Sequence, residues 1–307
     1  MAKQKKYKEN QEVETVRRAR HGGIWTFFFT ILSIIWILPI IIVVLNSFKR
    51  KAYIFKNPFG ISNVSLFDKG FDRWKAGISK TFIGFTNYAT AIKQTDFFHV
   101  FGYSLFITVA SVAVIILFCS MTAWYLVRVK TRATSFMYTL CLFSMIVPFQ
   151  MVMFTLSKFA NMLHLSNPVG IIVVYLGFGA GLAVFMFTGF IKGVSTEIEE
   201  AAMIDGCTPP QTFFKVLVPI MKPTIITVAI LESMWVWNDF LLPYLTLDIT
   251  KYRTIPIAIQ FLKQSHGQVD WGAMMAALVL AIVPIVIFYA AAQKYIIAGV
   301  LAGAVKG

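Results

Sequence analysis

Charged residues are scarce in this sequence: they make up 14% of its 307 residues, whereas hydrophobic residues make up 58%. Soluble globular proteins carry about 25% charged residues, because the side chains of a water-facing surface are largely polar. The composition therefore excludes a protein whose surface is solvated by water alone. A surface so poor in charge needs lipid as its solvent, which indicates an integral membrane protein.

The residue types that build metal sites, disulfides and nucleotide sites are also few. The three cysteines, Cys119, Cys141 and Cys207, show no paired spacing, and the four histidines are scattered singly. Neither a disulfide framework nor a zinc site is expected. The sequence has no G-x-x-x-x-G-K-[ST] phosphate loop, so we expect no ATP hydrolysis by this chain itself. A membrane-bound enzyme is disfavoured because no Ser/His/Asp, Cys/His or metal constellation is visible.

Long apolar runs, in contrast, are abundant. A bilayer core about 30 Å thick is crossed by about 20 residues of helix, and a helix satisfies its own backbone polar groups. The runs predict an all-α integral membrane protein with about six transmembrane helices. In the fourth of them, Gly177 and Gly181 have the four-residue spacing that allows close helix contact. The predicted spans are residues 24–48, 100–127, 133–157, 167–191, 223–247 and 271–293.

Basic residues flank the apolar runs and predict the orientation of the chain, because cytoplasmic loops of membrane proteins are enriched in Lys and Arg. The N-terminal tail at residues 1–23 and the C-terminal tail at residues 294–307 are both expected to be cytoplasmic. The first span is expected to remain as an anchor, since no clear small-residue cleavage site follows it. The net charge of +14 follows from this flanking pattern, so nucleic-acid binding is not predicted. The basic residues of the N-terminal tail are Lys3, Lys5, Lys6, Lys8, Arg17, Arg18 and Arg20.

The loops then alternate between the two faces of the membrane. Residues 49–99 and 248–270 are predicted to be external, and residues 192–222 to be cytoplasmic. The loop at 49–99 is itself rich in Lys and Arg, which disagrees with this orientation, although long loops cross membranes largely regardless of charge. Within it, a short surface helix is expected near Asn87 to Lys93.

The cytoplasmic loop carries the most consistent local signals. Thr196 with Glu199 predicts a capping box at the start of a short helix, and the acidic residues there suit the positive end of a helix. Asp205 and Gly206 predict the left-handed residue that ends this helix. On these signals alone, an ordinary structured loop resting on the membrane explains the segment as well as a stiff element that transmits force.

A second short helix is expected directly after the first. Thr208 with Gln211 predicts a second capping box, with proline at the first helical position. Pro219 and Pro223 are expected to break this helix, because proline cannot donate a backbone hydrogen bond.

The same loop resembles the cytoplasmic signature of the permease subunits of bacterial ABC importers, which is Glu-Ala-Ala, three residues, Gly, nine residues and Ile-x-Leu-Pro. This chain has Glu200-Ala201-Ala202, then Gly206, then Val216-Leu217-Val218-Pro219 at that spacing. Val216 and Val218 are conservative departures, and Cys207 stands where a small Ala is usual. Further matches resemble the second permease of the maltose-type carbohydrate importers: Thr86-Asn87-Tyr88, Trp237-Asn238-Asp239-Phe240-Leu241, Thr254-Ile255-Pro256 and Ala302-Gly303-Ala304-Val305-Lys306-Gly307.

The resemblance implies a type I ABC importer permease fold in the cytoplasmic membrane of a bacterium, and import of oligosaccharides or related polyols. It implies a second, different permease subunit, two ATPase subunits that bind ATP and Mg inside, and a sugar-binding protein outside. This chain would bind no cofactor itself, and would contact lipid but no nucleic acid. Glu200 would meet basic residues of the ATPase. The residues implied in coupling to the ATPase are Glu200, Ala201, Ala202, Asp205, Gly206 and Pro219.

The fifth span contains polar and aromatic residues that are candidates for a substrate path. Aromatic rings stack on sugar faces, and polar groups at membrane depth tend to line cavities. For Trp237, Asn238 and Asp239, anchoring at the external membrane boundary is an equal alternative. A secondary transporter is the rival function, but no internal repeat is visible and only Glu232 and Asp239 are charged within the runs. The candidates are Glu232, Trp235, Trp237, Asn238 and Asp239.

Overall fold

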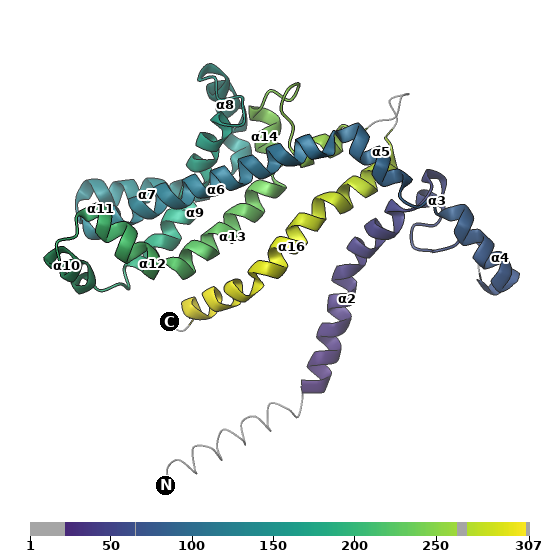
Figure 1. The fold of residues 1–307 in the computed structure, drawn as a ribbon, viewed down its shortest axis with the longest axis horizontal. Coiled ribbons are helices and arrows are strands. Elements are labelled where there is room, and N and C mark those ends of the chain that lie inside the picture. The colour runs from purple at the N-terminus through teal and green to yellow at the C-terminus, as the bar shows by residue number, and fades with distance from the viewer. Residues whose placement is uncertain (1–21, 65, 263–268, 305–307) are drawn as a thin grey trace, which may run out of the picture. The chain divides into compact units, whose positions relative to one another are not determined.

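The computed structural model describes residues 22–64, 66–262 and 269–304 (Figure 1). These residues are almost entirely helical and contain no β-strand, so the predicted all-α fold class is confirmed. Most of the predicted basic tail, and the last three residues of the closing motif, lie outside the described residues. The helices are α2 (Gly22–Ser47), α3 (Lys51–Lys56), α4 (Leu66–Thr81), α5 (Thr86–Thr95), α6 (Phe97–Arg128), α7 (Arg132–Ile146), α8 (Phe149–Met162), α9 (Gly170–Ile191), α10 (Thr196–Ile204), α11 (Pro209–Gln211), the π-helix η1 (Thr212–Leu217), α12 (Val218–Ile220), α13 (Lys222–Asn238), α14 (Leu241–Thr246), α15 (Ile255–Gln260) and α16 (Trp271–Ala304).

Among the described helices, four are long and apolar enough to cross a membrane: α2, α6, α9 and the Trp271–Gln293 part of α16. Two bent pairs raise this number to six if each pair forms one span. One pair is α7 with α8, bent by 106°, and the other is Pro209–Ile220 with α13, bent by 78°. The prediction of about six spans agrees with the larger number, although the predicted fifth span at 223–247 overlaps only the α13 part of the second pair.

The predicted third span, residues 133–157, is not one straight helix. α7 ends at Ile146, and α8 begins at Phe149 and continues to Met162. Pro148 lies at the break, where it has no N–H to donate and disfavours a helical conformation in the residue before it. Val147 is accordingly extended, with a ψ angle of 115°.

The chain forms two compact units. The first comprises residues 1–89 and 270–279. Within it, Asn87 joins α5 to the end of α2 and the residues that follow α2. The Asn87 side-chain amide donates hydrogen bonds to the carbonyl oxygens of Ser47 and Lys49, at 2.7 and 2.9 Å. Lys49 is itself fully buried, and this burial lowers the pKa of its ammonium group. The short helix predicted near Asn87 is confirmed as α5.

The second unit comprises residues 90–269 and 280–307 and is built around α6 and α9, which pack along each other. α7 packs against α9, and α13 packs against both α6 and α9 (Figure 1). The largest apolar cluster joins these helices to η1, with Ile115, Phe187, Phe213 and Leu217 among its buried members. Because η1 belongs to the predicted cytoplasmic loop, part of that loop is packed into the core of this unit.

Close contact in α9 occurs at Gly181, as predicted, but not at Gly177. A Cβ atom at Gly181 would lie 2.5 Å from Met145 Cγ and 2.9 Å from the backbone oxygen of Cys141, both on α7. A Cβ atom at Gly177 would meet nothing within 4 Å. The four-residue spacing places both glycines on one side of the helix, but the neighbouring helix reaches only one of them.

We therefore expect Gly181→Ala to destabilise the protein and Gly177→Ala to leave it unchanged or slightly stabilised. Overpacking of a close helix contact costs about 1–3 kcal/mol, whereas Ala in place of an exposed helical Gly gains about 0.5–1 kcal/mol. The measurement is the thermal unfolding temperature of each purified variant. Equal temperatures for the two variants would show that α7 and α9 do not approach each other as closely as described.

Candidate functional site

The predicted cytoplasmic loop begins with the nine-residue helix α10. Its N-cap is Ser195, whose Oγ accepts a hydrogen bond from the backbone N–H of Glu197 at 3.3 Å. The predicted capping box between Thr196 and Glu199 is wrong, because Thr196 is already the first helical residue and the Glu199 carboxylate binds a different helix. Glu197 and Glu199 do lie in the first turn, at the positive end of the helix dipole.

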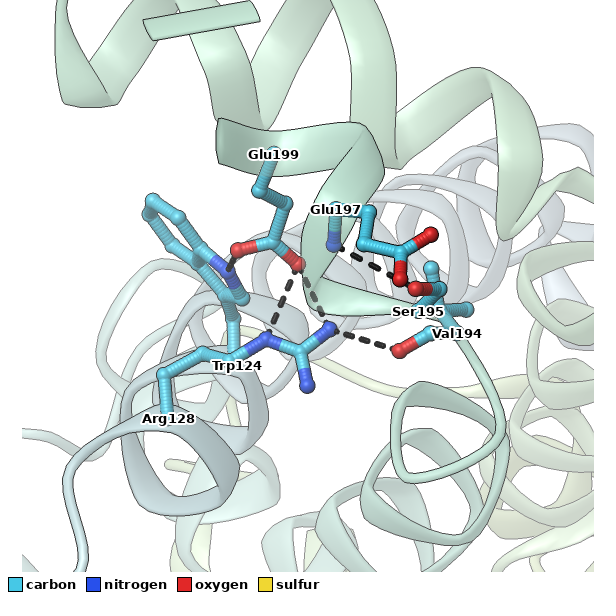
Figure 2. Close-up of polar contacts among 6 residues, drawn as sticks. All are labelled: Trp124, Arg128, Val194, Ser195, Glu197 and Glu199. Atoms are coloured by element: carbon cyan, nitrogen blue, oxygen red, sulfur yellow. Dashed lines mark hydrogen bonds and ion pairs between the residues drawn. The ribbon is translucent and has the colours of Figure 1, made fainter. Parts of the chain in front are cut away.

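Glu199 holds α10 against the last turn of α6 (Figure 2). Trp124 Nε1 donates to Glu199 Oε2 at 2.9 Å, and Arg128 donates to Glu199 Oε1 from Nε at 2.9 Å and from Nη2 at 2.6 Å. Arg128 Nη2 also donates to the carbonyl oxygen of Val194 at 3.1 Å. A buried carboxylate is costly unless it is paired and hydrogen-bonded. Since Glu199 is only 6% exposed, these bonds fix where α10 lies on α6.

Trp124 also contacts the second half of the loop. Its ring packs against the buried ring of Phe213 in η1, with ring centroids 5.4 Å apart and an angle of 34° between the planes. Two residues near the end of α6, Trp124 and Arg128, therefore hold both α10 and η1. The loop is a docked element of the second unit rather than a segment that only rests on the membrane.

The opposite face of α10 is exposed. Ile204, on the side away from Glu199, is 86% exposed. Met203, four residues after Glu199 and therefore next to it on the helix surface, is 51% exposed. Ala202 shares the inner face with Glu199 and is buried. Of the residues implied in coupling, Glu200, Ala201, Asp205, Gly206 and Pro219 are exposed, and Ala202 is the exception.

Gly206 ends α10 in the left-handed conformation, with φ of 86°, as predicted. The N–H of Gly206 donates to the carbonyl oxygen of Met203, and the N–H of Cys207 donates to that of Ala202, both at 3.0 Å. This pair of bonds is the Schellman motif, which satisfies the last carbonyl groups of a helix while the chain turns. Gly206 thereby sets the direction in which the chain leaves α10.

The predicted second helix is present but is not a regular α-helix. The capping box of Thr208 and Gln211 is confirmed, with the Thr208 N–H donating to Gln211 Oε1 at 2.8 Å. The helix then widens into the π-helix η1 and ends in α12, which has Pro219 in its first turn. π-Helical turns are rare and occur frequently at functional sites.

Glu232 lies one turn before Trp235 in α13, on the side of the helix that faces α9. It is 1% exposed, and neither carboxylate oxygen has a hydrogen-bond partner among the described residues. A Cβ atom at Gly179 would lie 3.1 Å from Glu232 Oε2 and 2.6 Å from Ile115 Cδ1. The Glu232 carboxylate is therefore enclosed between α9 and α6 in the described conformation, not turned into an open path.

The other four candidates lie near the end of α13, and two of them, Trp235 and Asp239, both contact Tyr175 of α9. Asp239 accepts hydrogen bonds from the Tyr175 hydroxyl at 3.2 Å and from the backbone N–H of Leu241 at 3.0 Å. It thus separates α13 from α14, and the predicted span at 223–247 is two helices. Trp235 makes an edge contact with the same Tyr175 ring. The other two side chains lie elsewhere: Asn238 donates to the Met234 carbonyl oxygen, and Trp237 lines a cavity of about 150 Å³ between α6, α13 and α16.

Sequence reasoning missed the roles of Trp124 and Arg128. Basic residues beside the spans indicated only the orientation of the chain, and Arg128 is one of them. Its partner Glu199 lies 71 residues away along the chain, a separation at which no local pattern operates. The only available signal was a lone arginine in the last turn of an apolar helix, and this signal did not indicate which residue the arginine would bind.

Comparisons with known proteins place these features in a family. The model of the family described as "Binding-protein-dependent transport system inner membrane component" matches residues 115–301. The chain is 37% identical over 281 residues to the "Probable starch degradation products transport system permease protein AmyC" of Thermoanaerobacterium thermosulfurigenes, covering 92% of this chain and 96% of the relative. It is 32% identical over 290 residues to the "Multiple sugar-binding transport system permease protein MsmG" of Streptococcus mutans, covering 92% and 96%.

A solved structure is also similar. A chain of the "bacterial ABC transporter involved in the import of the acidic polysaccharide alginate" superposes with a TM-score of 0.71 at 20% sequence identity, covering 91% of this chain and 97% of that chain. At this level of identity the likeness supports the fold alone.

Proposed function

Because the chain belongs to the family of binding-protein-dependent transport system inner membrane components, we propose that it is one of two different permease subunits of a bacterial ATP-driven importer of oligosaccharides or related polyols. Relatives named for starch degradation products, multiple sugars and arabinooligosaccharides support carbohydrate as the class of substrate. The chain forms half of the translocation pore, and as the second permease of the pair it needs the other permease to complete it.

The docked helix α10 is the observation that carries this proposal. Its inner face is fixed to α6 through Glu199, while its outer face presents Glu200 and the apolar Ile204 to a partner. An exposed apolar group beside a carboxylate on a rigid helix is suited to binding a protein surface with a cleft and basic residues. A movement of that partner would be passed through α10 to α6, and so to the pore.

The partner at α10 is an ATPase subunit, of which the importer has two. ATP and Mg are bound there, and this chain binds neither. A sugar-binding protein delivers the substrate from outside. A similar solved structure, with a TM-score of 0.58 at 16% identity, is described as a bacterial alginate ABC transporter in complex with an alginate pentasaccharide-bound periplasmic protein. This description supports the proposed sugar-binding protein as a partner.

The orientation proposed is that α10 and both termini are cytoplasmic. The link between α6 and α7 contains Lys130 beside the basic residues Arg128 and Arg132, and it lies at the same end of α6 as α10. Short basic links of this kind favour the cytoplasmic side. Among the candidates of the fifth span, Trp235 and Trp237 remain proposed contacts of the sugar path.

A photoreactive amino acid at Ile204 tests the proposed contact with the ATPase. In the assembled importer we expect it to crosslink to the ATPase subunit, because this side chain is the most exposed apolar group of α10. Phe136 is a matched control, since it is also large, apolar and exposed, at 64%, but belongs to a different helix, α7. It should yield no ATPase adduct.

Two outcomes separate the parts of the proposal. If the ATPase copurifies with the chain but Ile204 gives no adduct, α10 is not the coupling element although the importer assignment stands. If no ATPase copurifies and no sugar is taken up by the reconstituted complex, the importer assignment itself fails.

A further inference from the structure

A basic pocket lies at the end of the second unit where α6 and α9 finish and α7 begins. Its volume is about 490 Å³. The α6–α7 link contributes Lys130 and Thr131, the first turns of α7 contribute Arg132 and Ser135, and the end of α9 is followed by Lys192. The pocket is separate from the Glu199 contact with α6, which uses none of these residues.

The charge of this pocket is of one sign. Lys130, Arg132 and Lys192 line it, and no Asp or Glu does. The ion pairs among the described residues are Arg128 with Glu199 and Lys251 with Asp248, and none of them involves these three cations. Lys192 Nζ lies over the Tyr138 ring, 5.4 Å from its centroid, which holds the ammonium group at the pocket. The positive end of α7, a fifteen-residue helix, adds to the same field.

The other side of α7 exposes apolar side chains. Phe136 is 64% exposed, Leu140 is 52% exposed and Met137 is 48% exposed. Val127 and Leu126 line the pocket beside the cations. Cations and hydroxyl groups at the end of a span, with apolar side chains in the pocket and around α7, match the two parts of a phospholipid.

We propose that this pocket binds the headgroup of an anionic phospholipid, with the phosphate between Lys130, Arg132 and Lys192 and the acyl chains along α7. Basic pockets between membrane helices bind anionic headgroups through charge and hydroxyl contacts. The ordered lipid fixes the ends of α6, α7 and α9 together. Since α10 is held by the same end of α6, the lipid supports the base on which α10 is docked.

Native mass spectrometry of the assembled importer tests the proposal, with phosphatidylglycerol and phosphatidylcholine each titrated as the probe lipid. The variant is the double substitution Lys130→Gln and Lys192→Gln. Its matched control is Lys215→Gln with Lys222→Gln. This control removes two exposed lysines of the loop at 192–222 that do not line the pocket. Each basic group near an anionic membrane surface changes binding by about fivefold, so the variant should bind phosphatidylglycerol about thirtyfold more weakly.

The expected pattern is unchanged phosphatidylglycerol binding in the control and unchanged phosphatidylcholine binding in both variants. Equal loss in the variant and its control would show a general charge effect and overturn the site. Soluble glycerol phosphate is the third probe and should bind at least tenfold more weakly than the lipid, because it has no acyl chains. If it binds as tightly as phosphatidylglycerol, the pocket takes a free phosphate compound and the lipid assignment is overturned.

Discussion

Arg128→Met is expected to uncouple ATP hydrolysis from sugar import while the membrane subunits still insert and assemble. The substitution leaves the Glu199 carboxylate, whose side chain is 8% exposed, without its charged partner. Removing one member of a buried ion pair costs about 3–5 kcal/mol. The Arg128 side chain is 20% exposed, so solvent reduces the cost to about 2 kcal/mol. This cost lowers the ratio of docked to undocked α10 by about thirtyfold.

The measurement is the ATPase rate of the purified importer with and without its sugar-loaded binding protein. We expect the stimulation by the binding protein to fall sharply in Arg128→Met and to be intermediate in Arg128→Lys, which keeps the charge but not the forked geometry. Arg73→Met removes an exposed arginine of α4 and should behave as wild type. If Arg128→Met matches Arg73→Met, the contact between Arg128 and Glu199 does not transmit the signal.

Gly206→Val is also expected to have a large effect on ATPase copurification and sugar uptake, because it alters the direction of the chain after α10. At φ of 86°, a β-branched residue is strained by about 1–2 kcal/mol or more. No atom lies within 4 Å of the position of a Cβ there, so the effect comes from backbone strain alone and not from a clash. The strain would open the two bonds of the Schellman motif and move η1 relative to α10.

Gly206→Asn is the matched control, since Asn adopts left-handed conformations far more readily than Val. ATPase copurification and sugar uptake should decrease in the order Gly206, Gly206→Asn, Gly206→Ala and Gly206→Val. Equal activity of the Val and Asn variants would mean that the left-handed turn is not needed for coupling.

The features predicted well from the sequence are those with a local cause. Apolar runs of about 20 residues indicated the spans because a helix needs about that many apolar residues to cross the hydrocarbon core of a bilayer. Asp205 and Gly206 indicated the left-handed end of α10, and Thr208 with Gln211 indicated its neighbour, because these caps involve residues within one turn of one another. Pro148 carried a local signal for the break between α7 and α8, which the uniform hydropathy of the run concealed.

The features that were missed depend on residues far apart in the chain. Thr196 and Glu199 fit the capping-box pattern, but a carboxylate binds the strongest donors within reach, and the donors were on α6. Gly177 and Gly181 looked equivalent because helical spacing does not say where the neighbouring helix crosses. The enclosure of the Glu232 carboxylate also has no local signal, because it depends on how closely Gly179 lets α9 approach.

The most direct test of coupling through α10 is the number of sugar molecules imported per ATP hydrolysed in proteoliposomes that contain the complete importer. With the wild-type chain this ratio should be constant, and in Arg128→Met and Gly206→Val it should fall while ATP is still hydrolysed. Wild-type ratios in both variants would contradict the role given to α10 and to its attachment on α6.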